Sequence, residues 1–382
     1  MPLHTVKISV RQLVEFILRS GDIDVAYMGA NRAAEGTRAH QRVQRKKKAE
    51  AKANGFTYES EVFLQTDCAH RDILFHVEGR ADGVQRANDG EITVEEIKST
   101  LGAVPAYAPE ESHWHWAQAK CYGYMYLSGV QTDGETPRDE ETRANPPPPG
   151  LRVSLTYCQI ETETTRTFSL YFTCGELKSF FLALLEKYHA FAQMDADRIE
   201  ERNRTAKALP FPYGAYRAGQ REMAVAAFAA IKQGRKLFAQ APTGTGKTVS
   251  VLFPAVKSLS EGYGCKIFYL TAKTVARQAA EEALRHMTDK GLRMRGITLT
   301  AKDKICFCEP RRCDPEYCQY AKGHFDRVNA ALLDCLRGEP LLTRPVVENY
   351  ARKHSVCPSE FQLDLALFCD TVICDYNHVY DP

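Results

Sequence analysis

Apolar and polar positions in the first half of the chain form helical patterns separated by strand-like alternation. A helical pattern opens the chain, three short strand-like segments follow, and a helix, a β-hairpin and a further helix complete this half. The turn-forming Asn88-Asp89-Gly90 precedes the third strand and indicates a β-meander. The predicted elements are helix 9–55, strands 60–64, 73–77 and 92–97, helix 112–127, hairpin 153–172 and helix 177–194.

The pattern changes in the second half, where helices and strands alternate from Tyr216 onward. Strand Lys236–Gln240 is expected to enter a glycine-rich loop, and strand Lys266–Thr271 to follow the next helix. Such alternation predicts an α/β fold with a parallel sheet. A chain of 382 residues also exceeds one ordinary core, so we expect two domains, 1–202 and 203–382. The polar, proline-rich stretch 131–150 is expected to be a disordered loop.

Composition places the chain among globular proteins without selecting a partner. Hydrophobic residues make up 44% and charged residues 26%, and the formal net charge is +2. A nucleic-acid surface would therefore have to be a local patch. No signal peptide is visible, and no stretch approaches the roughly 18 apolar residues of a membrane span, so we expect a cytoplasmic protein without membrane contact.

The cysteines are unevenly distributed. Their number, thirteen, is odd and does not suit a disulfide framework in a reducing compartment. Cys306, Cys308, Cys313 and Cys318 follow one another closely, which is typical of a metal site.

A glycine-rich loop, Ala241–Thr248, follows the predicted strand and precedes an apolar helix. In that setting backbone N–H groups approach phosphates, the lysine carries charge to the β- and γ-phosphates, and the threonine hydroxyl binds Mg²⁺. A chance glycine-rich turn is the alternative, and the strand-to-helix context argues against it. The predicted nucleotide contacts are Thr243, Gly244, Thr245, Gly246, Lys247 and Thr248.

This loop and the residues before it resemble the superfamily 2 helicases of the XPD/DinG type. The resemblance rests on Ala-x-x-Gly-x-Gly-Lys-Thr together with Tyr216-Arg217-x-x-Gln220 upstream. It implies a RecA-like domain that binds ATP, with Gln220 contacting the adenine base. The segment Tyr269–Thr274 is similar to the family's element that contacts the DNA backbone.

The cysteines extend this resemblance. In XPD-like helicases four cysteines in this order hold a [4Fe-4S] cluster, which implies an insertion at about 301–360 in this chain. Cys308 is then the spare thiol or a replacement for one of the four, and zinc or inert thiols remain alternatives on spacing alone. The implied cluster ligands are Cys306, Cys313, Cys318 and Cys357.

The XPD/DinG resemblance also concerns the Asp-Pro with which the printed sequence ends. In these helicases Asp-Glu-Ala-His follows that stretch and positions Mg²⁺ and water, and the printed sequence contains no Asp-Glu-Ala-His. The chain is therefore expected to stop before this motif, to bind ATP weakly through Lys247, and to lack helicase-like turnover on its own.

A second set of charged residues lies in the first half. Asp82 is expected at the end of one strand, and Glu96 and Lys98 share one face of the next because side chains alternate along a strand. Two carboxylates and a lysine are what metal-dependent phosphodiester hydrolysis requires. Solvated charges on a surface hairpin are the simpler reading of these three residues alone.

Two further motifs favour the nuclease reading. Gly36-x-x-x-His40 precedes Gly79-Arg-Ala-Asp82, and Gln118-x-x-x-Tyr122 follows on one helix face. This order resembles the RecB-like branch of the PD-(D/E)XK nucleases. The resemblance implies that His40, Asp82 and Glu96 bind Mg²⁺ or Mn²⁺, that Lys98 serves catalysis, and that Gln118 and Tyr122 contact DNA.

The sequence thus predicts a PD-(D/E)XK nuclease fold followed by a RecA-like P-loop domain with a cysteine-rich insertion. We expect an ATP-dependent DNA helicase fused to a metal-dependent DNA nuclease, acting on single-stranded or branched DNA in repair or recombination. One alternative is a nucleotide-switched DNA-binding protein with an inert nuclease-like domain. The other is a zinc-stabilised nucleic-acid-binding ATPase.

Overall fold

The computed structural model describes residues 4–23, 30–106, 108, 110, 114–130, 149–242 and 244–380. It divides into two compact units, the first comprising residues 1–19 and 26–193 and the second residues 20–25 and 194–382. The predicted nucleotide contact Thr243 and nearly all of the expected loop 131–150 lie outside the described residues.

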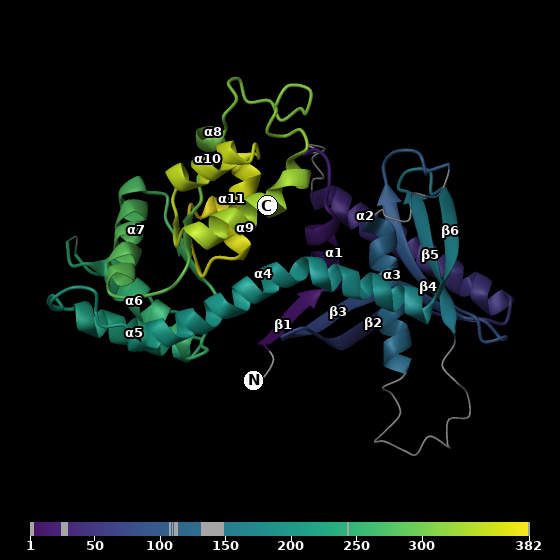
Figure 1. Ribbon diagram of the computed structural model, residues 1–382, viewed down its shortest axis with the longest axis horizontal. Coiled ribbons are helices and arrows are strands. Elements are labelled where there is room, and N and C mark those ends of the chain that lie inside the picture. The colour runs from purple at the N-terminus through teal and green to yellow at the C-terminus, as the bar shows by residue number, and fades with distance from the viewer. Residues whose placement is uncertain are drawn as a thin grey trace, which may run out of the picture. The chain divides into compact units, whose positions relative to one another are not determined.

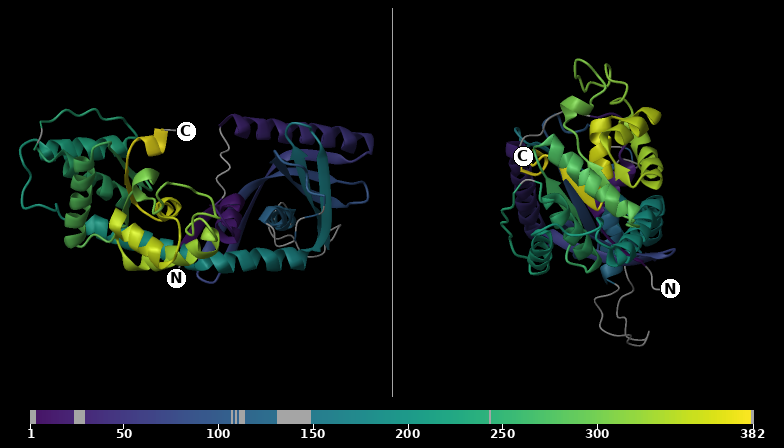
Figure 2. Two further views of the ribbon diagram at one scale, coloured as in Figure 1. Left: turned by 90° about the horizontal axis from the view of Figure 1, so that it is seen from above. Right: turned by 90° about the vertical axis from the view of Figure 1, so that its left-hand side faces the viewer.

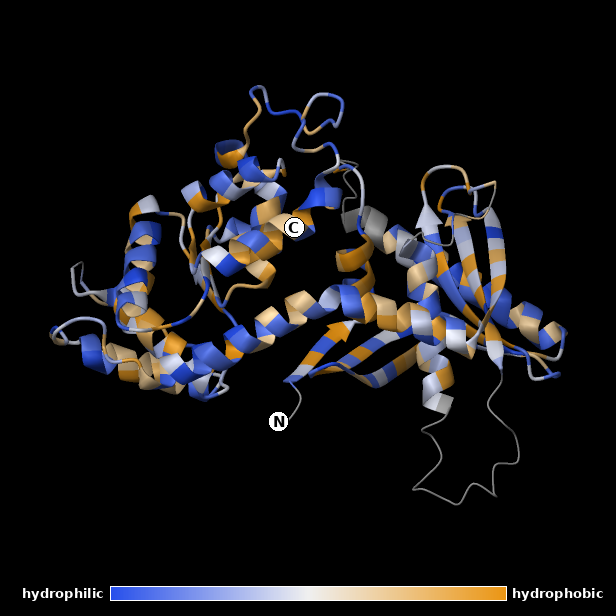
Figure 3. Cartoon of the chain, viewed as in Figure 1, coloured by the Kyte–Doolittle hydropathy of each residue, from blue (hydrophilic) through white to orange (hydrophobic). Residues whose placement is uncertain are grey.

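The first unit is built on a mixed six-stranded sheet (Figure 1). Strands β1 and β3 are parallel, β3 pairs antiparallel with β2 and β4, β4 and β5 are parallel, and β6 pairs antiparallel with β5. Hydrophilic and hydrophobic residues alternate along these strands (Figure 3). The strands are β1 His4–Ser9, β2 Thr57–His70, β3 Ile73–Arg86, β4 Ile92–Thr100, β5 Gly150–Gln159 and β6 Thr165–Thr173.

Strand β3 forks this sheet. Its first residues, Ile73–Glu78, pair with β1, and its last residues, Gly83–Arg86, pair with β4. Neither pairing includes residues 79–82, so on this side of β3 the backbone around Asp82 has no neighbouring strand. Asp82 therefore lies inside a strand, at the point where partners change, and the expectation that it ends a strand is wrong.

Helices cover both faces of the sheet. α2 (Ala30–Ala53) packs on one face, and α3 (Trp114–Val130) is the crossover that joins the parallel strands β4 and β5 on the other (Figure 2). α3 contributes Trp116, Ala119 and Met125 to the main apolar core. The sequence therefore folds as a helix, a meander, a crossover helix and a parallel strand.

The N-terminal segment differs from the predicted helix 9–55. Residues His4–Ser9 form a strand because β3 offers them a parallel partner. The Ser9 side chain then caps α1 (Val10–Leu18) by accepting from the Gln12 backbone N–H at 3.2 Å. The strands expected at 60–64, 73–77 and 92–97 and the hairpin at 153–172 are present, and β2 and β3 are much longer than expected.

The second unit holds a parallel four-stranded sheet in the order β7-β10-β8-β9. This confirms the expected α/β architecture with a parallel sheet. Its strands are β7 Ile267–Leu270, β8 Gly296–Thr298, β9 Leu341–Leu342 and β10 Thr371–Cys374. Its helices are α5 Gln220–Lys232, α6 Lys247–Ser260, α7 Thr274–Asp289, α8 Lys302–Ile305, α9 His324–Gly338, α10 Arg344–Lys353, α11 Pro358–Leu367 and α12 Asn377–Tyr380.

The strand expected at Lys236–Gln240 is absent. These residues form no regular element, and the Phe238 side chain is 92% exposed. A strand needs a neighbour for its backbone N–H and C=O groups, and no described strand pairs with this segment. The prediction from its apolar character is therefore wrong for this structure.

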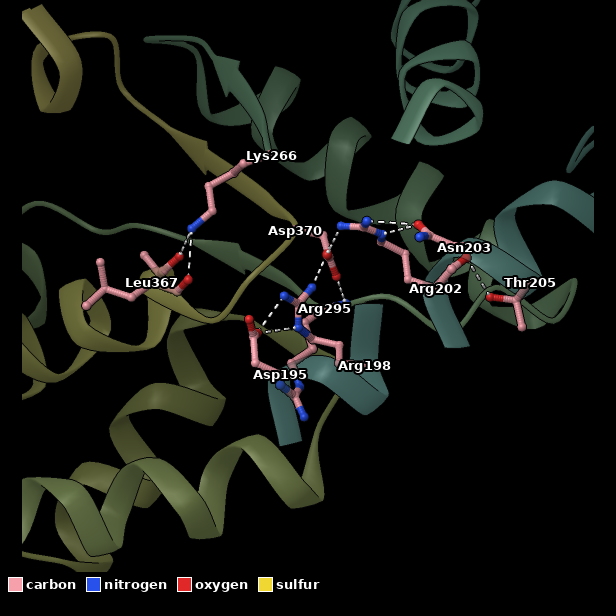
Figure 4. Close-up of polar contacts among 10 residues, drawn as sticks. Asp195, Arg198, Arg202, Asn203, Thr205, Lys266, Arg295, Leu367 and Asp370 are labelled. Atoms are coloured by element: carbon pink, nitrogen blue, oxygen red, sulfur yellow. Dashed lines mark hydrogen bonds and ion pairs between the residues drawn. The ribbon is translucent and has the colours of Figure 1, made fainter. Parts of the chain in front are cut away.

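Helix α4 (Cys174–Ala208) continues well past the predicted end at Met194. Its last turns belong to the second unit, where Arg198 and Arg202 both bind the buried Asp370 carboxylate, Arg202 at 2.8 Å (Figure 4). Asp370 also accepts the Arg295 backbone N–H at 3.0 Å. Among the described residues no helix is long and apolar enough to cross a membrane.

Candidate functional site

The first candidate site lies at the fork of the sheet in the first unit. Asp82 reaches across the opening, and one carboxylate oxygen accepts the Ile97 backbone N–H at 2.6 Å. Its other oxygen lies 3.5 Å from Nδ1 of His40, which α2 supplies. The structure therefore places His40 beside Asp82, and both residues were expected to be metal ligands.

Glu96 and Lys98 stand on β4 beside this fork. The Lys98 ammonium lies 2.8 Å from the Glu96 carboxylate and donates to the side-chain oxygen of Gln118 on α3. Burial raises the pKa of Glu96 to about 7, and the negative charge of Asp82 adds to this while Lys98 and His40 oppose it. A cation between these carboxylates would relieve the same electrostatic cost.

Tyr122 lies one helical turn beyond Gln118 and packs against β3. A Cβ atom on Gly79 would lie 2.8 Å from the Tyr122 ring, so only glycine permits this contact. Burial, together with the charges of Glu96 and Asp82, raises the pKa of the Tyr122 phenol. The glycine of the Gly79–Asp82 motif is therefore explained by the tyrosine that it accommodates.

Glu95 is a buried charge that the sequence reading did not single out. It points to the face opposite Glu96, where Tyr58 donates to it at 2.9 Å and the Lys47 ammonium lies at 3.0 Å. The Thr156 hydroxyl donates a second hydrogen bond to Glu95. The adjacent Glu95-Glu96 pair on a strand was the available signal, since neighbouring side chains point to opposite faces.

The donor set at the fork suits a hard divalent cation, because carboxylate oxygens are the preferred ligands of Mg²⁺ and Mn²⁺. Within the described part of the chain, no three His, Cys, Asp or Glu side chains are already arranged to hold a metal ion. Asp82 lies beside His40, and both of these residues are close enough to Glu96 to shift its pKa.

The second candidate site is the glycine-rich loop before α6. Gly244 and Gly246 have φ angles of +78° and +77°, which glycine adopts readily. Lys247 begins α6, and its ammonium donates to the carbonyls of Ala241 at 2.9 Å and Pro242 at 2.6 Å. Thr248 lies one residue further on, with its hydroxyl 3.4 Å from that of Tyr269. The loop therefore presents a helix N-terminus and a lysine to an anion.

Gln220 holds this loop from the preceding helix. Its side-chain oxygen accepts the Arg217 backbone N–H at 2.7 Å, and its amide donates to the Gly246 carbonyl at 3.4 Å. The Arg217 guanidinium donates to the Gly244 carbonyl at 2.6 Å. Gln220 is buried, so in this structure its amide positions the loop. A cavity of about 420 Å³ lies beside the loop, lined partly by Gln220 and Thr245.

A basic pocket of about 360 Å³ lies at the carboxyl ends of β7 and β10. Arg277, Lys302, Lys304 and His378 line it, and Arg277 pairs with Asp375 at 3.2 Å. Ligands of open parallel sheets bind beyond the carboxyl ends of the strands. The sequence motifs pointed only to Tyr269–Thr274 here, because Lys302, Lys304 and His378 come from segments farther along the chain.

Comparison with known families identifies the region around the loop. Residues 221–306 match the DEAD/DEAH box helicase family. This match supports a superfamily 2 helicase domain that uses ATP and Mg²⁺ and acts on nucleic acid. The matched residues begin directly after Gln220 and end at Cys306.

Other comparisons add little. No curated protein matches the chain. A solved structure, "Crystal structure of SSO0001", is similar at 17% identity with a TM-score of 0.30, covering 47% of this chain and 73% of that chain. Such an overlap is too low to establish a shared fold.

Several of the cysteines between Cys306 and Cys357 lie close together. The Cys308 thiol lies 3.5 Å from the Cys318 sulfur, and the Cys308 backbone N–H donates to the Cys306 sulfur at 3.5 Å. Cys318 and Cys357 share a small apolar core against which Cys308 packs. In the described residues Cys313 makes no hydrogen bond to another of these sulfurs. The structure thus brings Cys308, which was expected to be the spare thiol, into contact with Cys306 and Cys318. The predicted ligand Cys313 lies outside these contacts.

A short segment from far upstream completes this apolar core. Ile23 is buried beside Cys318 and Cys357, and its backbone N–H donates to the Ala321 carbonyl at 3.0 Å. Asp22 accepts the Gly323 backbone N–H at 2.6 Å. Residues 20–23 are therefore an integral part of the second unit, a long-range contact with no sequence signal.

Proposed function

We propose that the chain joins an ATP-dependent DNA helicase domain to a metal-dependent DNA nuclease domain. The observation that carries the nuclease half is the convergence of Asp82, Glu96 and Lys98 with His40 and Gln118 at the fork of the first sheet. The domain boundary near residue 202 and a role in repair or recombination belong to the same proposal.

The helicase half rests on the family match and on the loop geometry. ATP phosphates bind at the N-terminus of α6, where Lys247 exchanges its loop carbonyls for the β- and γ-phosphates and Thr248 holds Mg²⁺. Gln220 releases one of its contacts to reach the adenine base. The basic pocket with Arg277, Lys302 and Lys304 suits the phosphates of a DNA strand.

In the nuclease half Asp82, Glu96 and His40 would hold Mg²⁺ or Mn²⁺, which would supply Lewis-acid activation of a water molecule. Lys98, fixed between Glu96 and Gln118, orients the attacking water toward the scissile phosphate. Tyr122 and Gln118 contact the DNA from one face of α3.

The test is cleavage of labelled single-stranded DNA by the full chain with Mg²⁺ or Mn²⁺ and with EDTA. Asp82→Ala and Lys98→Ala are expected to reduce cutting at least about a hundredfold, the scale of losing a group that acts in the transition state. Glu91→Ala, an exposed carboxylate just before β4, is the matched control and is expected to cut normally. Undiminished cutting by both site variants would sink the proposed site, and no cutting by the parent chain would favour an inert nuclease-like domain.

We also infer that the cysteines between Cys306 and Cys357 bind a [4Fe-4S] cluster. The contacts of Cys308 with Cys306 and Cys318, and the shared core of Cys318 and Cys357, support a thiolate centre. The preference for iron over zinc comes from the family resemblance. Which four of the five cysteines serve, including Cys313, is decided by single substitutions.

Metal content tests this inference. Anaerobically purified protein is expected to be brown, with iron and acid-labile sulfide, and Cys318→Ser and Cys357→Ser are expected to remove the visible absorption. Cys369→Ser, a change at a buried thiol outside this group, is the control. A colourless protein with one equivalent of zinc in anaerobic preparations would establish the zinc alternative instead.

A further inference from the structure

A second concave surface lies on the helicase domain, on the face of α5 that points away from the glycine-rich loop. Gln220, Met223 and Ala226 of α5 line the cavity beside the loop. Arg221 and Ala224, which directly follow Gln220 and Met223 in α5, line a separate cavity of about 600 Å³. We call this cavity, between α5 and the second half of α6, the α5–α6 groove.

The floor of the α5–α6 groove is apolar. Ala224 and Pro254 are buried at its base, and Phe228 and Phe253 form its walls. Val225 stands at the opening with 63% of its side chain exposed. Val225 thus continues the apolar floor of the groove out to the surface.

The rim of the groove is basic. Lys207, Arg221, Lys232 and Lys257 line it, against the single carboxylate of Glu261. The Lys257 ammonium donates to the Lys207 backbone carbonyl at 2.9 Å. A partner that fits this rim carries carboxylates around an apolar side chain.

The aromatic rings in the groove are already packed, which argues against nucleic-acid bases as the occupant. Tyr216 stacks on Phe211 with ring centroids 3.8 Å apart. Phe253 meets Phe211 edge to face at 5.6 Å, and Phe228 meets Tyr263 in the same way at 6.0 Å. Binding of single-stranded nucleic acid relies on free ring faces for stacking.

We propose that the α5–α6 groove docks an acidic, amphipathic peptide segment of a partner protein. Its apolar side chains enter beside Val225 and Phe253, and its carboxylates meet the rim lysines and arginine. Grooves between two helices commonly receive such segments through side chains spaced three or four residues apart. The proposal uses neither the nuclease site nor nucleotide hydrolysis, so it stands independently of the proposed function.

The experiment selects binders from a displayed library of random peptides of about twelve residues, with the full chain as bait. Selected peptides are synthesised with a fluorophore, and their affinity is measured by anisotropy. We expect a consensus in which Asp or Glu flanks Leu, Ile, Phe or Trp. Selected sequences without acidic enrichment would overturn the proposal.

Variants locate the binding surface. Val225→Glu and Lys232→Glu are expected to weaken the selected peptide at least about tenfold. Leu367→Glu, at a position also 63% exposed but on α11, is the matched control and is expected to bind normally. Thermal unfolding of each variant shows that it is folded.

Two outcomes contradict the proposal. Equal affinity of the parent chain and both groove variants would place the peptide elsewhere. A single-stranded oligonucleotide that displaces the peptide from the parent chain, and that no longer binds the same two variants, would make the groove a nucleic-acid surface.

Discussion

At the scale of single residues, Glu96 links the stability of the chain to pH. The pKa of Glu96 in the folded chain is about 7, above that of an ordinary carboxyl group, because the side chain is buried. Between these two values the folded state keeps a proton that the unfolded state has released, so the free energy of unfolding falls as pH rises. Below the ordinary value both states are protonated and the penalty is absent.

Glu96→Gln removes this penalty. In EDTA, the midpoint of thermal unfolding is expected to rise by a few degrees at about pH 8 and to change little at about pH 4. Exposed Glu91→Gln is the control and should shift neither value. An equal change at both pH values would show that Glu96 does not titrate in this way.

Lys247 is the residue on which nucleotide binding depends. Its ammonium bonds only to loop carbonyls among the described residues, so Lys247→Ala deletes the charge without disturbing a packed core. The affinity for a fluorescent ATP analogue is expected to fall at least about tenfold. Lys290→Ala, an exposed change after α7, serves as the control, and unchanged affinity in Lys247→Ala would remove the nucleotide site from this loop.

At the scale of elements, the end of α4 is fastened to the parallel sheet by buried charge. Asp370 precedes β10 and binds Arg198 and Arg202 of α4, and its side chain is inaccessible to solvent. Asp370→Ala leaves buried Arg202 without its carboxylate partner and Arg198 with Asp195 alone, which is expected to cost about 3 to 5 kcal/mol in urea unfolding. Arg344→Ala breaks the exposed pair with Glu348 and is expected to cost about 0.5 kcal/mol or less.

The segment 20–23 is a second element whose role is structural. Ile23 covers Cys318 and Cys357, so Ile23→Ala is expected to speed alkylation of both thiols several-fold in metal-free protein, because it opens a cavity beside them. Mass spectrometry after timed iodoacetamide treatment measures the rates. Cys369, buried outside this core, is the internal control, and equal acceleration at Cys369 would indicate general unfolding instead.

At the scale of the whole molecule, the two proposed activities belong to different units with their own cores. Changes at distant sites with no shared partners act independently. Asp82→Ala is therefore expected to abolish DNA cutting while ATP affinity stays at the parent value. Lys247→Ala is expected to lower ATP affinity while DNA cutting, assayed without ATP, stays at the parent rate. Loss of both functions in either variant would show that the units do not act separately.

Much of the local architecture could be predicted from the sequence. The loop with Gly244, Gly246 and Lys247 was recognisable because its chemistry depends on neighbours in the chain. The common face of Glu96 and Lys98 followed from strand alternation. The meander and the parallel sheet of the second unit followed from the pattern of apolar residues, whereas the role of the helix at 112–127 as a crossover did not.

The remaining features depend on contacts between distant segments. His4–Ser9 is a strand because β3 lies beside it as a parallel partner. Lys236–Gln240 does not form a strand, since no described strand pairs with it. Cys308 rather than Cys313 meets Cys318 because loop closure, and not spacing, sets which thiols approach. Backbone pairing and side-chain burial are completed by partners far away in the chain, so tertiary structure alone decided them.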